Sequence, residues 1–278
     1  MLLPVFIKTV IVPLKQQNVS CSIYLSLGDN ELVGQLPWSQ ISHMTKLTHF
    51  DVSKNFLNST IESEVGAMSN LVALRLDNNY RLNDGTGNII SYGMIGSIPE
   101  SIGNLNLLQE LRIDNNFLDG AIPSTLGNLQ SLITLRMESN NFQSSIPSEF
   151  GNLFNLQYLH LWSNYLSSTI CSELGNLNQL QELFLDDNEL TGSIPSELGQ
   201  LAGVNYISLA ENHLDGVIPP TFGMLSNLKR LDVQFNYLYG EVPQQMANLS
   251  IGELHMEIFF FIQREHVIHD CCRVPVCD

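Results

Sequence analysis

The chain is 278 residues long, with 44% hydrophobic and 14% charged residues, which is enough for one or two globular units. Aspartate and glutamate number 28 against 12 lysines and arginines, and the formal net charge at pH 7 is -16. Nucleic-acid binding requires a basic surface, so this balance excludes nucleic acid as an expected partner and favours cationic proteins or neutral glycans.

Residues 1–21 form a flank before the first repeat. Residues 1–14 are apolar enough to suggest a signal peptide, although Lys8 interrupts them, no basic region precedes them and no A-x-A site follows. This is a weak export signal, and it leaves an intracellular chain open as an alternative. A second apolar run, Ile258 to Ile262, is far shorter than the roughly 20 residues of a membrane-spanning helix, so no transmembrane segment is expected.

Residues 22–257 repeat the pattern L-x-x-L-x-L-x-x-N-x-L-x-G-x-I-P. From Asn116 onward the asparagine recurs every 24 residues, within the roughly 20 to 29 residues of a leucine-rich repeat. An amide at the turn after a strand bonds backbone groups that would otherwise be buried without partners, so we interpret this asparagine as structural. It occupies positions Asn30, Asn55, Asn79, Asn116, Asn140, Asn164, Asn188, Asn212 and Asn236.

Each repeat is predicted to contribute one short strand. The L-x-L core alternates with period 2, so Leu111 and Ile113 point inward while Arg112 and Asp114 point outward. Stacked copies predict an α/β fold, a right-handed solenoid or curved horseshoe. Its concave face carries a parallel sheet and its convex face carries short 3-10, helical or irregular segments. Nine strands about 4.8 Å apart would span roughly 38 Å. The regular strands are expected to centre on Leu111, Leu135, Leu159, Leu183, Ile207 and Leu231.

The motif L-x-G-x-I-P followed by x-x-L-G-N-L, as in Leu118 to Leu129, resembles the plant-type subclass of leucine-rich repeats. That resemblance covers roughly residues 22–257. It implies an extracellular protein similar to the ectodomains of receptor-like kinases and receptor-like proteins, or to polygalacturonase-inhibiting proteins. The chain departs from the subclass at its N-terminus, where only Cys21 replaces the expected paired-cysteine cap with its tryptophan.

The interval between Asn79 and Asn116 is 37 residues, so 13 extra residues lie within 80–94. Gly85, Gly87 and the neighbouring asparagines and aspartate predict an irregular loop. Insertions map to one edge of such a solenoid, so the loop is either a ligand-contacting projection or surface length without function.

Period-2 alternation also identifies the side chains on the concave face. Arginines and aromatic residues gather near the middle of the sheet, and such clusters are typical of binding hot spots. The alternative is a charge ladder in which each arginine neutralises the acid two residues later, Asp77, Asp114 or Glu138, for under about 1 kcal/mol each. The predicted ligand-binding residues are Arg75, Arg112, Arg136, Tyr158, His160, Trp162, Glu182, Phe184 and Tyr206.

No catalytic motif is present: G-x-S-x-G, a Walker loop and H-E-x-x-H are all missing. An open sheet also fails to exclude water, so we expect no enzyme, no catalytic residue, no cofactor and no metal. Three sequons mark candidate glycosylation sites at Asn58, Asn18 and Asn248, of which Asn58 lies in a turn beside a strand and is the best candidate.

The closing repeat is expected to be degenerate, because Ile251, Leu254 and Met256 keep the apolar spacing without the asparagine. The tail, residues 258–278, is predicted not to continue the solenoid. Exported members of the subclass often carry a disulfide there, which makes Cys271, Cys272 and Cys277 disulfide candidates. Two histidines before them leave a metal site as the alternative.

The resemblance therefore implies a non-catalytic extracellular recognition module. Its expected partner is a protein or peptide ligand on the concave face, in signalling or defence, with a membrane-bound co-receptor as a further partner. An inhibitor of a secreted hydrolase and an intracellular interaction scaffold are the two alternatives.

Overall fold

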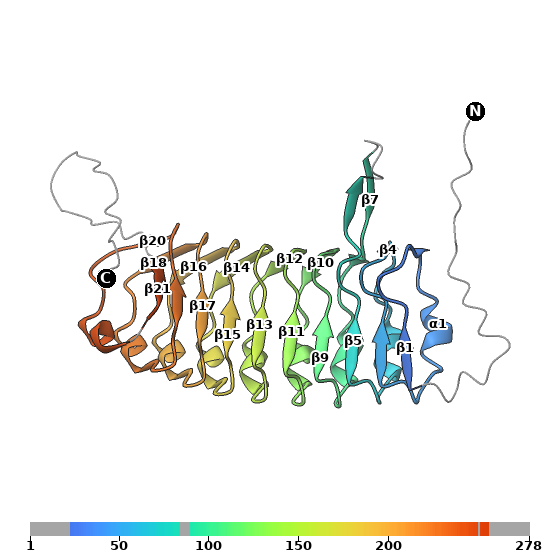
Figure 1. The fold of residues 1–278 in the computed structure, drawn as a ribbon, viewed down its shortest axis with the longest axis horizontal. Helices are drawn as coiled ribbons and strands as arrows, with labels where there is room; N and C mark the ends of the chain where they lie inside the picture. Colours follow the sequence, from blue (N-terminus) through green and yellow to red (C-terminus); the bar gives the residue numbers. More distant parts are fainter. Residues whose placement is uncertain (1–22, 84–88, 250, 256–278) are drawn as a thin grey trace.

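Ten short parallel strands lie side by side along the length of the molecule, each supplied by one repeat (Figure 1). The computed structural model describes residues 23–83, 89–249 and 251–255. The degenerate closing repeat contributes the tenth strand, one more than the nine expected. In order, the strands are β1 (Tyr24–Ser26), β3 (His49–Asp51), β5 (Ala73–Arg75), β9 (Glu110–Arg112), β11 (Thr134–Arg136), β13 (Tyr158–His160), β15 (Glu182–Phe184), β17 (Tyr206–Ser208), β19 (Arg230–Asp232) and β21 (Glu253–His255).

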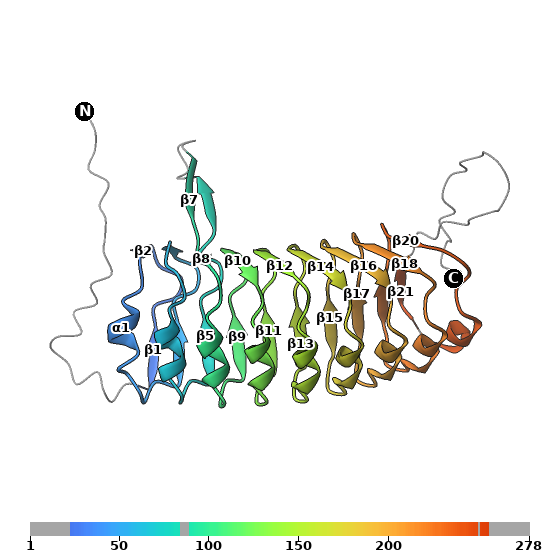
Figure 2. The same cartoon turned by 180° about the vertical axis from the view of Figure 1, so that it is seen from behind.

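Short helical turns cover the other side of this sheet, as Figure 2 shows from behind. All but one are 3-10 turns, each starting directly after the I-P motif or its equivalent, which confirms the expected convex face. They are α1 (Trp38–Ile41), η2 (Ser63–Ala67), η3 (Glu100–Asn104), η4 (Ser124–Asn128), η5 (Ser148–Asn152), η6 (Ser172–Asn176), η7 (Ser196–Gln200), η8 (Pro220–Met224) and η9 (Gln244–Asn248).

The glycine of the G-N-L motif sets how closely these turns stack. A Cβ atom on Gly127 in η4 would lie 2.5 Å from the carbonyl oxygen of Glu149 in η5, far inside contact distance. The same close approach recurs between Gly151 and Glu173 one repeat later. Only a residue without a side chain lets neighbouring turns pack at this spacing.

A second parallel sheet of seven strands, which the sequence pattern did not predict, follows the asparagine of each repeat. Two further pairs of strands flank it, one of them parallel and one antiparallel. The seven strands are β8 (Ile95–Gly96), β10 (Phe117–Ala121), β12 (Asn141–Ser144), β14 (Tyr165–Thr169), β16 (Glu189–Ser193), β18 (His213–Gly216) and β20 (Tyr237–Leu238), and the parallel pair is β2 (Val33–Gly34) with β4 (Phe56–Leu57).

The hydrophobic core is one continuous stack between the two sheets and the turns. Leu159 pairs in register with Leu135 on one side and Leu183 on the other, and none of the three is exposed. Every predicted strand centre from Leu111 to Leu231 lies in the middle of an observed strand. The period-2 assignment of inward and outward residues is therefore confirmed for these repeats.

The recurrent asparagine forms a ladder inside the solenoid, as the sequence predicted. The Asn164 side-chain amide donates hydrogen bonds to the carbonyl oxygens of Leu161 at 3.1 Å and Met137 at 3.2 Å. Its oxygen accepts a hydrogen bond from the backbone N–H of Phe142 at 3.0 Å. Asn164 thus joins two neighbouring repeats through backbone groups, and the asparagines from Asn55 to Asn236 make the equivalent contacts.

The described part of the insertion within residues 80–94 is not the irregular loop that the sequence suggested, while Gly85 and Gly87 lie outside the described residues. It contains two antiparallel strands, β6 (Arg81–Asn83) and β7 (Ile89–Tyr92), which project from the solenoid (Figure 1). Isoleucine and tyrosine favour strands, which is consistent with the pairing of these two segments. At its base the Tyr80 ring lies 4.7 Å from the Phe117 ring of the next repeat.

Candidate functional site

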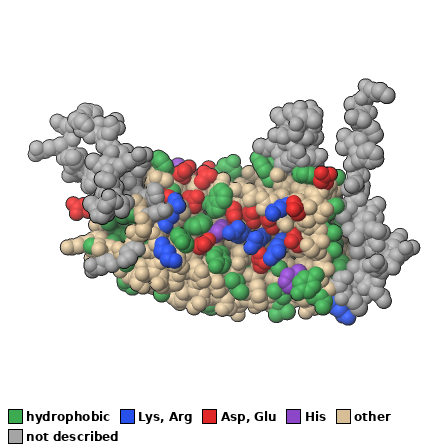
Figure 3. All heavy atoms as spheres, viewed as in Figure 1, with side chains coloured by type: hydrophobic (Ala, Val, Ile, Leu, Met, Phe, Trp, Pro, Cys, Tyr) green, Lys and Arg blue, Asp and Glu red, His purple; other side chains and the backbone are tan. Residues whose placement is uncertain are grey.

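Strand register aligns the predicted outward residues into one column across the open face of the ten-stranded sheet. Arg75, Arg112, Arg136, His160 and Phe184 are direct neighbours on β5, β9, β11, β13 and β15. Figure 3 shows this face, with charged side chains gathered over its middle and hydrophobic side chains beside them. The structure therefore brings together five of the nine predicted ligand-binding residues in a single row.

The arginines do not form the predicted charge ladder along their own strands. Arg75 Nη2 lies 2.7 Å from Glu110 Oε2, and Arg112 Nε lies 2.5 Å from Glu110 Oε1, so one carboxylate serves two guanidinium groups. Arg75 also lies 3.8 Å from Asp51. Within the ranges that the structure describes, Arg136 has no ion pair or side-chain hydrogen bond, and it is the unpaired cation of the row.

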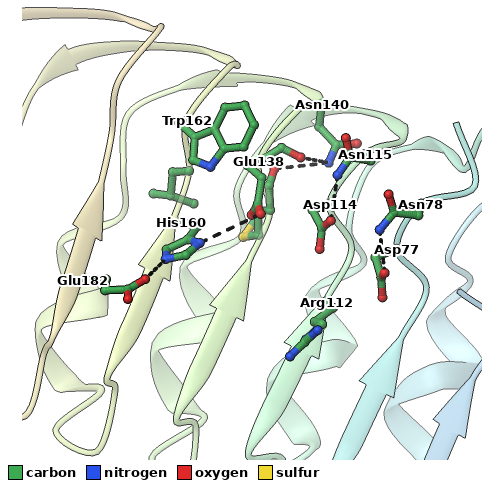
Figure 4. A network of polar contacts seen from close by, with 12 residues as sticks. Asp77, Asn78, Arg112, Asp114, Asn115, Glu138, Asn140, His160, Trp162 and Glu182 are labelled. Atoms are coloured by element: carbon green, nitrogen blue, oxygen red, sulfur yellow. Dashed lines mark hydrogen bonds and ion pairs between the residues drawn. The ribbon is translucent and has the colours of Figure 1, made fainter. Parts of the chain in front are cut away.

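The carboxylates of Asp77 and Asp114 turn instead toward the asparagine that follows each of them. Asn78 Nδ2 donates to Asp77 Oδ2 and Asn115 Nδ2 donates to Asp114 Oδ2, both at 2.8 Å. Figure 4 shows Arg112 pointing away from Asp114. This local amide contact explains why the predicted Arg75–Asp77 and Arg112–Asp114 pairs are absent from the described residues.

Asp77, Asp114 and Glu138 form a buried acid row two residues beyond the arginines, with exposed fractions of 6%, 4% and 4%. Burial raises the pKa of Asp77, and burial together with the charges of Glu138 and Asp77 raises the pKa of Asp114 to about 7. One oxygen of each carboxylate has no hydrogen-bond partner among the described residues. Desolvated carboxylates in one row repel one another, so this part of the face attracts positive charge.

His160 lies on the predicted face, but neighbouring side chains bury it to 4% exposure. Its Nε2 is 2.9 Å from Glu182 Oε2, its Nδ1 is 3.9 Å from Glu138 Oε1, and its ring stacks on Phe184 at 4.6 Å. Figure 4 shows the imidazole between the two carboxylates. The expected ligand contact at His160 is therefore corrected: the ring positions Glu182 and Phe184 rather than facing the solvent.

The four predicted aromatic residues, Tyr158, Trp162, Phe184 and Tyr206, are half-buried rather than freely exposed. The Tyr158 hydroxyl lies 3.3 Å from Gln181 Oε1, and Lys229 Nζ lies 5.9 Å from the centre of the Tyr206 ring. These contacts hold the Tyr158 and Tyr206 rings, and stacking on His160 holds the Phe184 ring, while part of each ring stays exposed. A prepositioned apolar surface beside Arg136 is suited to an amphipathic ligand.

Sequence reasoning missed a hollow beside this row. It has a volume of about 320 Å³ and lies over the first strands of the sheet, around Ser26, Asp51, Ser53, Arg75, Asp77 and Arg112. Glu110 and Asp77 stand in outward columns that also hold the predicted residues Tyr158 and Trp162, so period-2 alternation already places both on this face.

Other predicted sites fall into two groups. Asn58 is exposed, and Asn248 ends η9. Cys171, which was not among the predicted sites, is a free, half-buried thiol, and burial raises its pKa to about 11. Asn18, Cys271, Cys272 and Cys277 lie outside the described residues, so the glycan at Asn18 and a disulfide among the three cysteines remain predictions.

Within the part of the chain that the structure covers, no side-chain cluster fits a metal ion. No helix there is sufficiently long and apolar to cross a bilayer.

Two family models match the chain, one described as leucine-rich repeat region over residues 90–193 and one as leucine rich repeat over residues 178–238. No curated protein matches it. Several solved plant receptor ectodomains have the same fold. That of the Arabidopsis thaliana membrane receptor kinase GASSHO1/SCHENGEN3, solved with CASPARIAN STRIP INTEGRITY FACTOR 2, is 37% identical over 84% of this chain, with a TM-score of 0.77.

Two further structures are similar. The plant peptide hormone receptor RGFR1, in complex with RGF2, is 32% identical over 86% of this chain, with a TM-score of 0.79. The Arabidopsis receptor kinase HAESA, in complex with the peptide hormone IDA and the co-receptor SERK1, is 34% identical over 85%, with a TM-score of 0.73. The present chain spans only 27%, 36% and 38% of these three chains, taken in the order given.

Proposed function

The chain belongs to the plant-type leucine-rich repeat proteins, and from this we propose that it is a non-catalytic recognition module that binds a peptide or protein ligand on the open face of its ten-stranded sheet. The observation that carries the proposal is the group of half-buried aromatic side chains on the same face as Arg136, which has no ion pair within the described residues; they are Tyr158, Trp162, Phe184 and Tyr206. Similarity to ectodomains solved with peptide hormones supports a peptide as the ligand, in signalling or defence, and a membrane-bound co-receptor as a further partner.

The binding centre is proposed to be Arg112, Arg136, Tyr158, Trp162 and Phe184, with Arg75, Glu182 and Tyr206 at its borders. A ligand that covers Trp162 and Phe184 gains roughly 25 cal/mol per Å² of apolar surface removed from water. Arg136 offers a guanidinium to a ligand carboxylate without first breaking an ion pair, because it has none within the described ranges. The aromatic side chains would thus supply affinity, and the adjacent Arg136 would fix the direction in which the ligand lies on the face.

Substitutions on this face should weaken ligand binding. We would select short peptides from a displayed random library on the full chain and measure their affinity by calorimetry. Trp162→Ala and Arg136→Ala are each expected to weaken a selected peptide by about tenfold or more, as hot-spot truncations do. The control is Asn128→Ala, an exposed residue of η4 on the opposite side. Equal affinity in all three variants would move the site elsewhere, with the β6–β7 hairpin as the next candidate.

We further propose that the protein is extracellular and carries a glycan at Asn58. Asn58 is exposed, while Ser59 is buried and hydrogen-bonded within the solenoid, so a glycan would extend into solvent without displacing the core. Protein secreted from a eukaryotic host should lose mass on enzymatic deglycosylation, and Asn58→Gln should abolish most of that loss. Secreted protein of unmodified mass, or an Asn58→Gln variant with an unchanged loss, would contradict the site.

A further inference from the structure

The hollow over the first strands of the sheet contains an acid that the rest of the fold leaves without a partner. Asp77 is 6% exposed, and its Oδ1 forms no hydrogen bond within the described chain. Its other oxygen accepts only from Asn78. A buried carboxylate oxygen without a donor is unfavourable by roughly 1 to 3 kcal/mol, so a donor brought by a ligand into the hollow that Asp77 lines would stabilise it.

Charged groups of both signs line the hollow beside Asp77, and the exposed Asp29 is one of them. Arg75 and Arg112 are both held by Glu110, and Asp51 Oδ1 accepts hydrogen bonds from the N–H of Ser53 at 3.0 Å and from its hydroxyl at 2.7 Å. Lys54 lines the hollow and is exposed, and it forms no ion pair with Asp77 in the described structure. Among the lining carboxylates, Asp77 is the one that is both buried and left with an oxygen that no described residue satisfies.

Neighbouring charge favours a cationic donor over a neutral one. Asp114 and Glu138 continue the acid row from Asp77, and each has an oxygen without a hydrogen-bond partner among the described residues. A second feature keeps the hollow open: Gly28 lines it, and a Cβ atom there would lie 2.9 Å from Asp51 Oδ1. The space beside Asp51 is therefore kept free by the lack of a side chain.

We infer that this hollow is a subsite for a basic group, a guanidinium or an ammonium, with Asp77 as its principal acceptor. The inference rests on the proposed function, because the basic group would belong to the ligand bound on the same face. It adds a chemical requirement: the ligand carries an arginine or lysine near the segment that crosses β3 and β5. The net charge of -16 favours the same class of ligand through long-range attraction.

The test uses a small probe rather than the unidentified ligand. N-acetyl-arginine N-methylamide is titrated into the full chain, with its neutral citrulline analogue alongside, and the side-chain amide resonance of Asn78 reports binding by NMR. The arginine probe should bind saturably and the citrulline analogue about tenfold or more weakly, because a charge-assisted hydrogen bond is replaced by a neutral one. Equal binding of both probes, or no binding of either, would overturn the subsite.

Variants assign the effect to Asp77. Asp77→Asn should weaken the arginine probe about tenfold. Asp186→Asn is the matched control, because Asp186 lies in the same outward column and already accepts a hydrogen bond from Ser208. It should leave the affinity for the arginine probe within about twofold of the wild type. Gly28→Ala should also weaken binding of the arginine probe, because the added methyl group crowds Asp51. This second variant keeps the subsite testable if Asp77→Asn folds poorly. Unchanged affinity in folded Asp77→Asn refutes the subsite. Trp162→Ala should leave probe binding intact, although it is expected to weaken the selected peptides. The two measurements therefore distinguish failure of the subsite from failure of the proposed function.

Discussion

Replacing Leu159 with alanine is expected to lower the free energy of unfolding by about 2 to 5 kcal/mol. Leu159 is fully buried, and it lies in register between Leu135 and Leu183 of the adjacent repeats. The truncation removes apolar contacts and leaves a cavity at two interfaces at once. Each repeat of a solenoid is stabilised mainly by its neighbours, so the loss should weaken both interfaces of this repeat. Chemical denaturation of the two proteins measures it.

Leu107→Ala is the matched control, because it makes the same chemical change at a side chain that is 50% exposed. Its loss should stay below about 1 kcal/mol, since exposed substitutions away from packed features have small effects. A loss of under about 1 kcal/mol at Leu159 would mean that the core register is wrong. A shift in the denaturant slope would instead indicate that the repeats no longer unfold as one unit.

Asp114→Asn should stabilise the protein at neutral and higher pH. In the unfolded chain this carboxyl titrates near 3.8, whereas burial and the charges of Glu138 and Asp77 raise its folded pKa to about 7. The folded chain therefore binds the proton more tightly, and stability declines as the pH rises from about 4 to about 7. The difference between the folded and unfolded pKa, at about 1.36 kcal/mol per pH unit, sets a ceiling of about 4 kcal/mol on this effect. We expect the free energy of unfolding of Asp114→Asn to exceed that of the wild type by about 1 to 4 kcal/mol at pH 8.

The measurement is the free energy of unfolding of both proteins across this pH range. The asparagine variant keeps an oxygen for the Asn115 amide, so the local hydrogen bond is retained. Its advantage over the wild type should be absent near pH 4 and complete above about pH 7. The exposed Asp119→Asn is the control and should show no such rise. A constant difference at all pH values would show that Asp114 is charged in the fold.

Much of the arrangement of side chains on the open face of the ten-stranded sheet followed from local rules. Period-2 alternation forces Arg112 and Phe184 to one side of the sheet, and a spacing of 24 residues forces equivalent positions of successive repeats into register. The asparagine ladder followed in the same way, because a buried backbone needs a partner at every turn. These features depend on the pattern within one repeat and on its regular recurrence, so the sequence alone is enough to define them.

The sequence by itself thus determined the solenoid, the strand centres and the column of outward side chains. Only the tertiary structure decided how those side chains meet: Glu110 takes both Arg75 and Arg112, which are separated from one another by 37 residues, and His160 is enclosed by Glu138 and Glu182. The β6–β7 hairpin and the hollow at Asp77 were likewise decided by the tertiary structure. Outward side chains have several rotamers and several partners within reach across strands, and the choice among them depends on contacts that no single repeat contains.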